Sequence, residues 1–124
     1  MSFADPLNEI VKGCGGGIGA LLMGGDGIPI EQVVGSTVPT GPLSEDLATA
    51  GVEFGRILDD IRKASDALAG GAVHETVVVL SRFTLLFRIV DEDVFVVVVL
   101  EPDGNIGKAR YLIRRQLSAI RRNL

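Results

Sequence analysis

The stretch Val94-Phe95-Val96-Val97-Val98-Val99-Leu100 is apolar at every position and consists almost entirely of β-branched and aromatic residues. Such residues favour strands, and the run is too short to cross a membrane. A strand that is apolar on both faces must be covered on both faces. We therefore expect this strand to lie at the centre of a sheet that carries helices on both sides.

Two more strands are expected directly upstream of it. Residues Thr76 to Leu80 and Phe83 to Val90 are rich in β-branched and large apolar side chains. The acidic triplet Asp91-Glu92-Asp93 separates the second of them from the central run, and its simplest interpretation is a hairpin turn. If residues 76–80 form an edge strand, their unpaired backbone groups can pair with a second copy of the chain, and a blunted edge in a monomer is the alternative.

A hairpin is expected near the N-terminus. Two mostly apolar runs, residues 18–23 and 28–34, flank Asp26-Gly27, a dipeptide that tolerates the positive φ angles of a tight turn. Pro29 cannot donate a hydrogen bond to a neighbouring strand. The second strand of this hairpin should therefore lie at an edge of the sheet.

Three helices complete the pattern. The first should open at Asp5-Pro6, with Asp5 as the N-cap and Pro6 as the first helical residue. The second should run from an N-cap at Ser44 to about Ala69, and the third from about Asn105 to the end. The apolar face of the long helix is expected to comprise Leu47, Phe54, Leu58, Ile61 and Leu68. That of the last helix should comprise Ile106, Ala109, Ile113, Leu117 and Ile120.

The resulting order is α-β-β-α-β-β-β-α. It predicts an α+β (α/β) fold, with a five-stranded, mostly antiparallel sheet and helices on both faces. The length of 124 residues suits a single domain spanning residues 1–124.

Composition excludes several classes of protein. Although 47% of the residues are hydrophobic, no apolar run is long enough for a membrane span, and the first residues lack the features of a signal peptide. The single cysteine, Cys14, cannot form an internal disulfide, and its expected role is structural. With one histidine, His74, and no second soft ligand near Cys14, we expect no metal site and no cofactor. A cytoplasmic location fits these features.

The net charge of −4 hides an asymmetry. Residues 1–104 carry six basic and sixteen acidic side chains, a balance of −10, whereas residues 105–124 carry six basic side chains and no acidic one. A basic helix can contact nucleic acid, anionic lipid or an acidic protein. No aromatic residue except Tyr111 lies among these arginines, so we expect a solvated helix face and no nucleic-acid partner.

The motifs that could indicate catalysis are incomplete. The glycines from Gly13 to Gly19 follow a helix and precede a strand, which is the reverse of a nucleotide-binding loop. Asp59 and Asp60 are adjacent on a helix and point in different directions. No serine, cysteine or aspartate completes a triad with His74. We therefore expect no catalytic residues and no enzyme activity of the chain's own.

Three segments together resemble the Roadblock / dynein light chain family. Residues 19–30 are similar to that family's opening hairpin, and the long helix that leads into a strand near Thr76 is similar to its central helix. The third is the run Val94 to Leu100 followed by Asn105-Ile106-Gly107-Lys108-Ala109-Arg110, which resembles the family's last strand and helix start. The compact chain looks most like the bacterial, MglB-like branch.

This resemblance implies a profilin-like, Roadblock-type sandwich in a regulatory or scaffolding protein. Its members pair as homodimers or heterodimers through sheet edges and central helices, and bacterial members often work with a Ras-like small GTPase. The residues then expected at a GTPase-binding surface are Arg56, Asp59, Asp60 and Lys63. Those expected at a dimer interface are Leu58, Arg62, Thr76, Val78 and Leu80.

Several interpretations stay open. The charges of the long helix have a simpler explanation as ion pairs within the helix. Arg56 could instead supply a trans arginine to a GTPase. The protein as a whole could be a GTPase-independent dimeric interaction or assembly module. It could also be a small-molecule sensor domain, which would require a sizeable internal apolar pocket.

Overall fold

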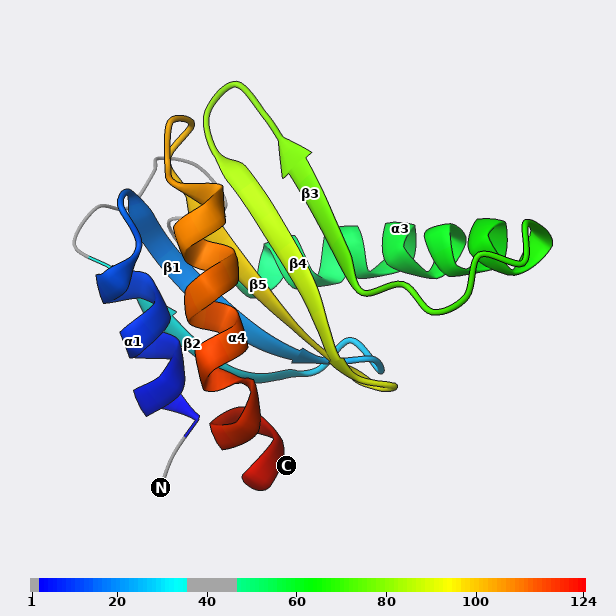
Figure 1. Cartoon of the computed structure of the whole chain (residues 1–124), viewed down its shortest axis with the longest axis horizontal. Helices are drawn as coiled ribbons and strands as arrows, with labels where there is room; N and C mark the ends of the chain where they lie inside the picture. The colour runs from blue at the N-terminus through cyan, green and yellow to red at the C-terminus, as the bar shows by residue number, and fades with distance from the viewer. Residues whose placement is uncertain (1–2, 36–46) are drawn as a thin grey trace.

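A computed structural model describes residues 3–35 and 47–124. In these residues one sheet has the strand order β2-β1-β5-β4-β3, and every neighbouring pair is antiparallel (Figure 1). The elements are α1 (Ala4–Gly13), β1 (Gly17–Gly24), β2 (Pro29–Val34), α3 (Ala48–Ala67), β3 (Glu75–Val79), β4 (Thr84–Asp91), β5 (Val94–Leu100) and α4 (Ile106–Arg122). The predicted order and the antiparallel sheet are thus confirmed.

The apolar run Val94–Leu100 forms β5, the central strand of the sheet, as its sequence predicts. From Val96 to Leu100 every residue has no exposed surface. The predicted edge position of β2 is confirmed, and β3, for which an edge position was considered only as a condition, lies at the other edge. Each of these strands pairs with only one neighbour among the described strands. Pro29 is the first residue of β2. Because β2 is an edge strand, the missing N–H of Pro29 does not interrupt the hydrogen bonding of a central strand.

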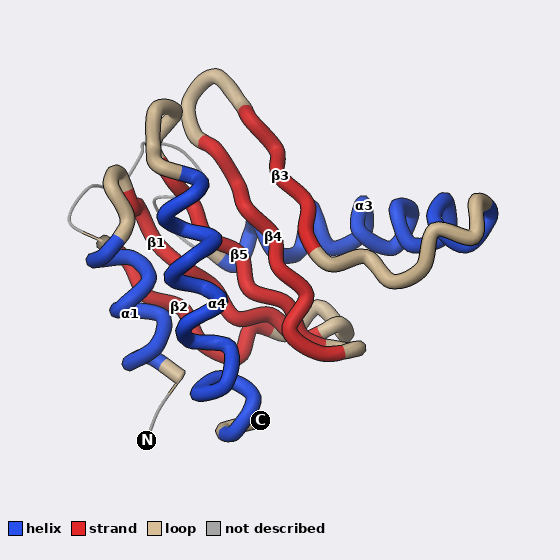
Figure 2. The backbone as a smooth tube through the Cα atoms, viewed as in Figure 1, coloured by secondary structure: helices blue, strands red, loops and turns tan. Residues whose placement is uncertain are grey.

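One face of the sheet is covered by α1 and α4, which lie side by side across it (Figure 2). Leu7 and Ile10 of α1 and Ile120 of α4 have no exposed surface, and Ile113 is 1% exposed. Asn105 caps α4, since its side chain accepts a hydrogen bond from the Lys108 N–H at 2.9 Å. The predicted apolar stripe of the last helix is the face that packs here.

The opposite face is covered by α3, which crosses the sheet and then projects well beyond it (Figure 1). Leu47 and Leu58 pack against the sheet and are each 3% exposed. The ring of Phe54 packs against that of Phe87 in β4, with centroids 5.6 Å apart. Beyond Leu58, no residue of α3 is buried. The second half of the helix therefore packs only weakly against the sheet of its own chain.

Two predicted helix boundaries differ from the structure. The first helix begins at Ala4 after Phe3, so Asp5 and Pro6 lie inside its first turn and Asp5 is not the N-cap. Pro6 is tolerated there because the first N–H groups of a helix have no intrahelical acceptor. Leu68, predicted on the buried face of the long helix, follows its end and is 82% exposed. The predicted N-cap Ser44 lies outside the described residues.

Candidate functional site: a groove between α3 and the first hairpin

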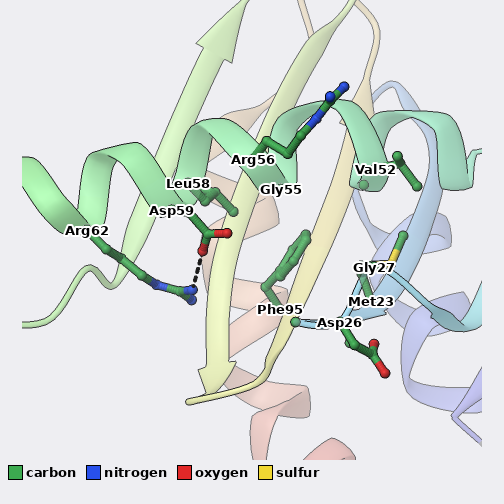
Figure 3. A pocket seen from close by; sticks show the side chains of 13 residues that line it. Met23, Asp26, Gly27, Val52, Gly55, Arg56, Leu58, Asp59, Arg62 and Phe95 are labelled. Carbon is green, nitrogen blue, oxygen red and sulfur yellow. Dashed lines mark hydrogen bonds and ion pairs between the residues drawn. The ribbon is translucent and has the colours of Figure 1, made fainter.

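A surface groove of about 360 Å³ lies where α3 passes the turn between β1 and β2 (Figure 3). Met23 and Phe95 come from the sheet, residues 24–27 form the wall on the hairpin side, and α3 forms the other wall. The α3 residues that line it are Gly51, Val52, Gly55, Arg56, Leu58, Asp59 and Arg62.

Two glycines bring α3 close to the sheet at this groove. A Cβ atom on Gly51 would stand 2.8 Å from Leu21 Cδ2 and closer still to Met23 Cε, which is shorter than real Cβ contacts. A Cβ on Gly55, one turn later, would meet only Phe95 Cζ at 3.7 Å. Because residues four apart share a helix face, the two glycines leave a bare strip of backbone beside the groove.

The hairpin wall is fixed by its own turn. Gly27 has a φ of +85°, a conformation that residues with a side chain rarely adopt. The Asp26 carboxylate accepts a hydrogen bond from the Ile28 N–H at 3.1 Å, which closes the turn as an Asx motif. The predicted Asp26-Gly27 hairpin is thus present, and it gives the groove a defined rim.

Ion pairs occupy the charged side of the groove. Arg56 Nη2 lies 2.9 Å from Glu53 Oε2, and the two side chains are 74% and 59% exposed. Arg62 Nη1 lies 3.1 Å from Asp59 Oδ1 in the next turn of the helix, and Figure 3 shows this pair beside the groove. Both pairs join residues three apart and lie on the surface, where such contacts are weak. Each arginine would have to leave its ion pair before it could contact a partner.

The structure brings only part of the predicted site together. Arg56 and Asp59, predicted for partner binding, line the groove, and so does Arg62, predicted for the dimer interface. Asp60 and Lys63 are exposed on α3 and are not among the lining residues. Leu58 is 3% exposed and belongs to the core under the helix, although it also reaches the groove.

The other residues predicted at a dimer interface follow β3. Thr76 and Val78 are half-buried on this edge strand, and Leu80, directly after it, is 38% exposed. Val79, which the sequence analysis did not select, is 68% exposed. The open edge of β3 therefore presents apolar side chains as well as unpaired backbone groups.

Gly51, Gly55 and Phe95 also line the groove but were not predicted from the sequence. The signal for the glycines was available, because two glycines one helical turn apart on a long helix indicate a close approach. Phe95 was assigned to the central strand, but its position under α3 depends on strand order, which the local pattern does not contain.

Little in the described residues indicates catalytic chemistry. No group of three or more histidine, cysteine, aspartate or glutamate side chains that could hold a metal ion occurs within residues 3–35 and 47–124. Burial raises the pKa of the Cys14 thiol, and the charge of Lys108 partly offsets this. Cys14 follows the last residue of α1, as predicted, and its thiol is held in the unreactive protonated form. No helix in the described part of the chain is long and apolar enough to span a membrane.

No protein-family model matches the sequence, and neither does any curated protein. Among solved structures, MglC from Myxococcus xanthus is 33% identical, covers 100% of both chains and superposes with a TM-score of 0.68. A Roadblock/LC7 domain from Streptomyces avermitilis has a TM-score of 0.83 at 14% identity and covers 99% of this chain and 98% of its own. The gliding protein MglB from Thermus thermophilus has a TM-score of 0.82 at 20% identity, with 96% and 85% covered.

The antiparallel sheet with α1 and α4 on one face and the long α3 on the other has the architecture of a Roadblock/LC7 domain. The chain belongs to the Roadblock/LC7 family, as the 33% identity with MglC over the full length of both chains establishes. The family resemblance noted in the sequence is thus confirmed. MglB and MglC are both among the similar structures, and the identity to MglC is higher than the 20% to the Thermus MglB.

Proposed function

We propose that this protein is a dimeric cytoplasmic regulator that binds a Ras-like small GTPase and modulates its nucleotide cycle without an active site of its own. The kinship with MglC and the fold shared with the gliding protein MglB support a regulatory role. The two partners, a second copy and a GTPase, would bind different surfaces of the chain.

The proposal of a dimer rests on the part of α3 that the chain's own sheet does not cover. No residue of α3 after Leu58 is buried, and the helix projects past β3 (Figure 1). Ile57 on the same helix is 48% exposed and Val79 on the neighbouring edge strand is 68% exposed. A second copy related by a twofold axis would pair β3 with β3 and cover the projecting halves of both helices.

The groove beside α3 supports the GTPase part. It combines exposed charges at Arg56 and Asp59 with an exposed apolar side chain at Val52, 44% exposed. Charges of this kind mainly guide encounter and register with a partner. Such a partner surface can act by ordering a GTPase's own switch loops, which requires no catalytic group from the regulator.

A second candidate, a GTPase-independent assembly module, is favoured by one observation. Arg56, the residue that could act in trans on a GTPase, is already paired with Glu53. A sensor domain fits less well, because the groove beside α3 is open and is lined partly by charged residues.

Nucleotide-dependent binding separates the first two functions. The purified chain should be titrated by calorimetry with a Ras-like GTPase from the same organism, loaded with GDP or with a non-hydrolysable GTP analogue. Preference for the GTP-analogue form, lost on Arg56→Ala with Asp59→Ala and retained with Lys63→Ala, supports the regulator. Equal or absent binding to both forms by a dimeric chain supports the assembly module.

A further inference from the structure

On the face of the sheet opposite the groove, a small pocket of about 220 Å³ lies between the β3–β4 pair and α4. The described residues that line it are Glu75, Arg88, Arg110, Ile113 and Arg114. Three guanidinium groups and one carboxylate thus meet in a pocket that the regulator function does not use. The net formal charge of this lining is therefore +2.

Arg88 is the central residue of this pocket. It lies on β4 between Leu86 and Val90, which share its face of the sheet and are buried in the core beneath α1 and α4. Its Nε atom is buried and has no hydrogen-bond partner among the described residues. A buried N–H group without an acceptor is unfavourable unless a water molecule or an ion completes it.

Glu75, the acidic residue paired with Arg88 across the two strands, already forms an ion pair with another arginine. Glu75 lies directly opposite Arg88 in the register of β3 and β4. However, both carboxylate oxygens of Glu75 accept from Arg110 Nε, each at 2.9 Å. None of the ion pairs in the described part of the chain involves Arg88 or Arg114. Two guanidinium charges therefore face the pocket without a compensating acid.

We propose that this pocket is a binding site for a phosphate-type oxyanion, either inorganic phosphate or the phosphate of a monoester. Guanidinium groups bind phosphate and carboxylate oxygens through paired, charge-assisted hydrogen bonds. A phosphate group with a charge of about −1.5 to −2 at neutral pH matches two uncompensated arginines better than a carboxylate does. The pocket is smaller than the ~300 Å³ at which sites for drug-sized ligands begin, so it suits a single oxyanion.

The surroundings raise the local concentration of anions. Within its 17 residues α4 carries six basic side chains and no acidic one. Such a surface attracts anions from solution. The sequence predicts that the arginines of the last helix form a solvated face. Two of them, Arg110 and Arg114, instead line the proposed oxyanion pocket.

The site can be tested by following the arginine Nε–H signals of the intact chain in ¹H–¹⁵N spectra. Sodium phosphate is titrated against sodium chloride at constant ionic strength and pH. We expect the Arg88 Nε–H signal to shift and saturate with phosphate and to stay in place with chloride. O-phosphoserine in a parallel titration distinguishes the source: tighter binding than phosphate indicates a monoester, and weaker binding indicates the free ion.

Arg114→Gln provides the decisive variant, because this exposed residue can be changed without disturbing the core. We expect it to weaken phosphate binding by roughly tenfold, since it removes one charged donor. Arg115→Gln is the matched control, because its guanidinium lies over the Tyr111 ring at 5.8 Å and is not in the pocket. Arg88→Gln should abolish binding, with the backbone spectrum reporting whether the variant is folded.

Three results would overturn the proposal: the same shift with chloride as with phosphate, equal phosphate affinity for the Arg114→Gln and Arg115→Gln variants, or acetate binding as tightly as phosphate. The last result would make the pocket a carboxylate site. None of these outcomes depends on whether the protein binds a GTPase, so the two proposals fail separately.

Discussion

Gly51 of α3 and Leu21 of β1 lie so close that a Cβ atom on residue 51 would stand 2.8 Å from Leu21 Cδ2. Leu21 and Met23, whose side-chain tips the added Cβ would meet, both have no exposed surface, so these tips have to move within a packed core. We therefore expect Gly51→Ala to lower the free energy of unfolding by about 1–3 kcal/mol, the usual cost of overpacking a core. Urea denaturation measures the effect.

Gly55→Ala is the matched control on the same helix face. Its Cβ would make an ordinary contact of 3.7 Å with Phe95. Replacing a helical glycine by alanine under those conditions should stabilise the protein by roughly 0.5–1 kcal/mol. If both variants are stabilised equally, α3 does not approach the sheet as closely at Gly51 as the structure indicates.

The open edge of β3 gives a prediction for self-association. Val79, which is 68% exposed, should lie in the proposed dimer interface. A lysine there would bring two like charges together across the twofold axis, so Val79→Lys should weaken the dimer by at least about tenfold. Val34→Lys is the control, since Val34 is 52% exposed on the other edge strand, β2.

Analytical ultracentrifugation over a concentration series measures both dissociation constants. A dimer weakened by Val34→Lys and not by Val79→Lys would assign the interface to β2 instead of β3.

Cys14 gives a prediction for pH dependence. Burial raises the pKa of its thiol above the ordinary value of 9.0, so the folded chain holds this proton more tightly than the unfolded chain. The associated stability is complete below pH 9.0 and is lost as the pH rises through the raised value. Urea denaturation at pH 7 and pH 10 should show a smaller loss for Cys14→Ala than for the unchanged chain. Equal losses would mean that the thiol does not resist ionisation in the folded state.

The cap of α4 can be tested directly. The Asn105 side chain accepts the Lys108 N–H at 2.9 Å. Asn105→Ala removes this acceptor and should cost about 1 kcal/mol of unfolding free energy. Asn105→Asp keeps an acceptor oxygen and should be nearly neutral, as measured by the midpoint of thermal unfolding. Equal losses for the two variants would show that the cap does not depend on the side-chain oxygen.

The parts of the fold that follow from local pattern could be predicted from the sequence. The run Val94–Leu100 places a strand at the centre of the sheet, Asp26-Gly27 places a hairpin, and Asn105 places the start of α4. The start of α1 was predicted too late in the chain, because Asp5 and Pro6 fit the first turn of a helix as well as its cap.

The sites depend on contacts that no local pattern contains. Arg110 and Glu75 are 35 residues apart, and their pairing, which leaves Arg88 without its cross-strand partner, appears only once α4 packs over β3 and β4. Likewise, the apolar spacing predicted that Leu68 is buried. It could not show that α3 extends beyond the edge of the sheet, so that Leu68 is exposed.

In the proposed dimer, a second copy completes the α3 and β3 surface. The most direct test is the solution mass of the purified chain by multi-angle light scattering, at concentrations from the low micromolar range upward. We expect a mass of twice the 13.1 kDa of the single chain. A mass of 13.1 kDa at every concentration would contradict it and would show that the exposed half of α3 and the edge of β3 are stable without a partner copy.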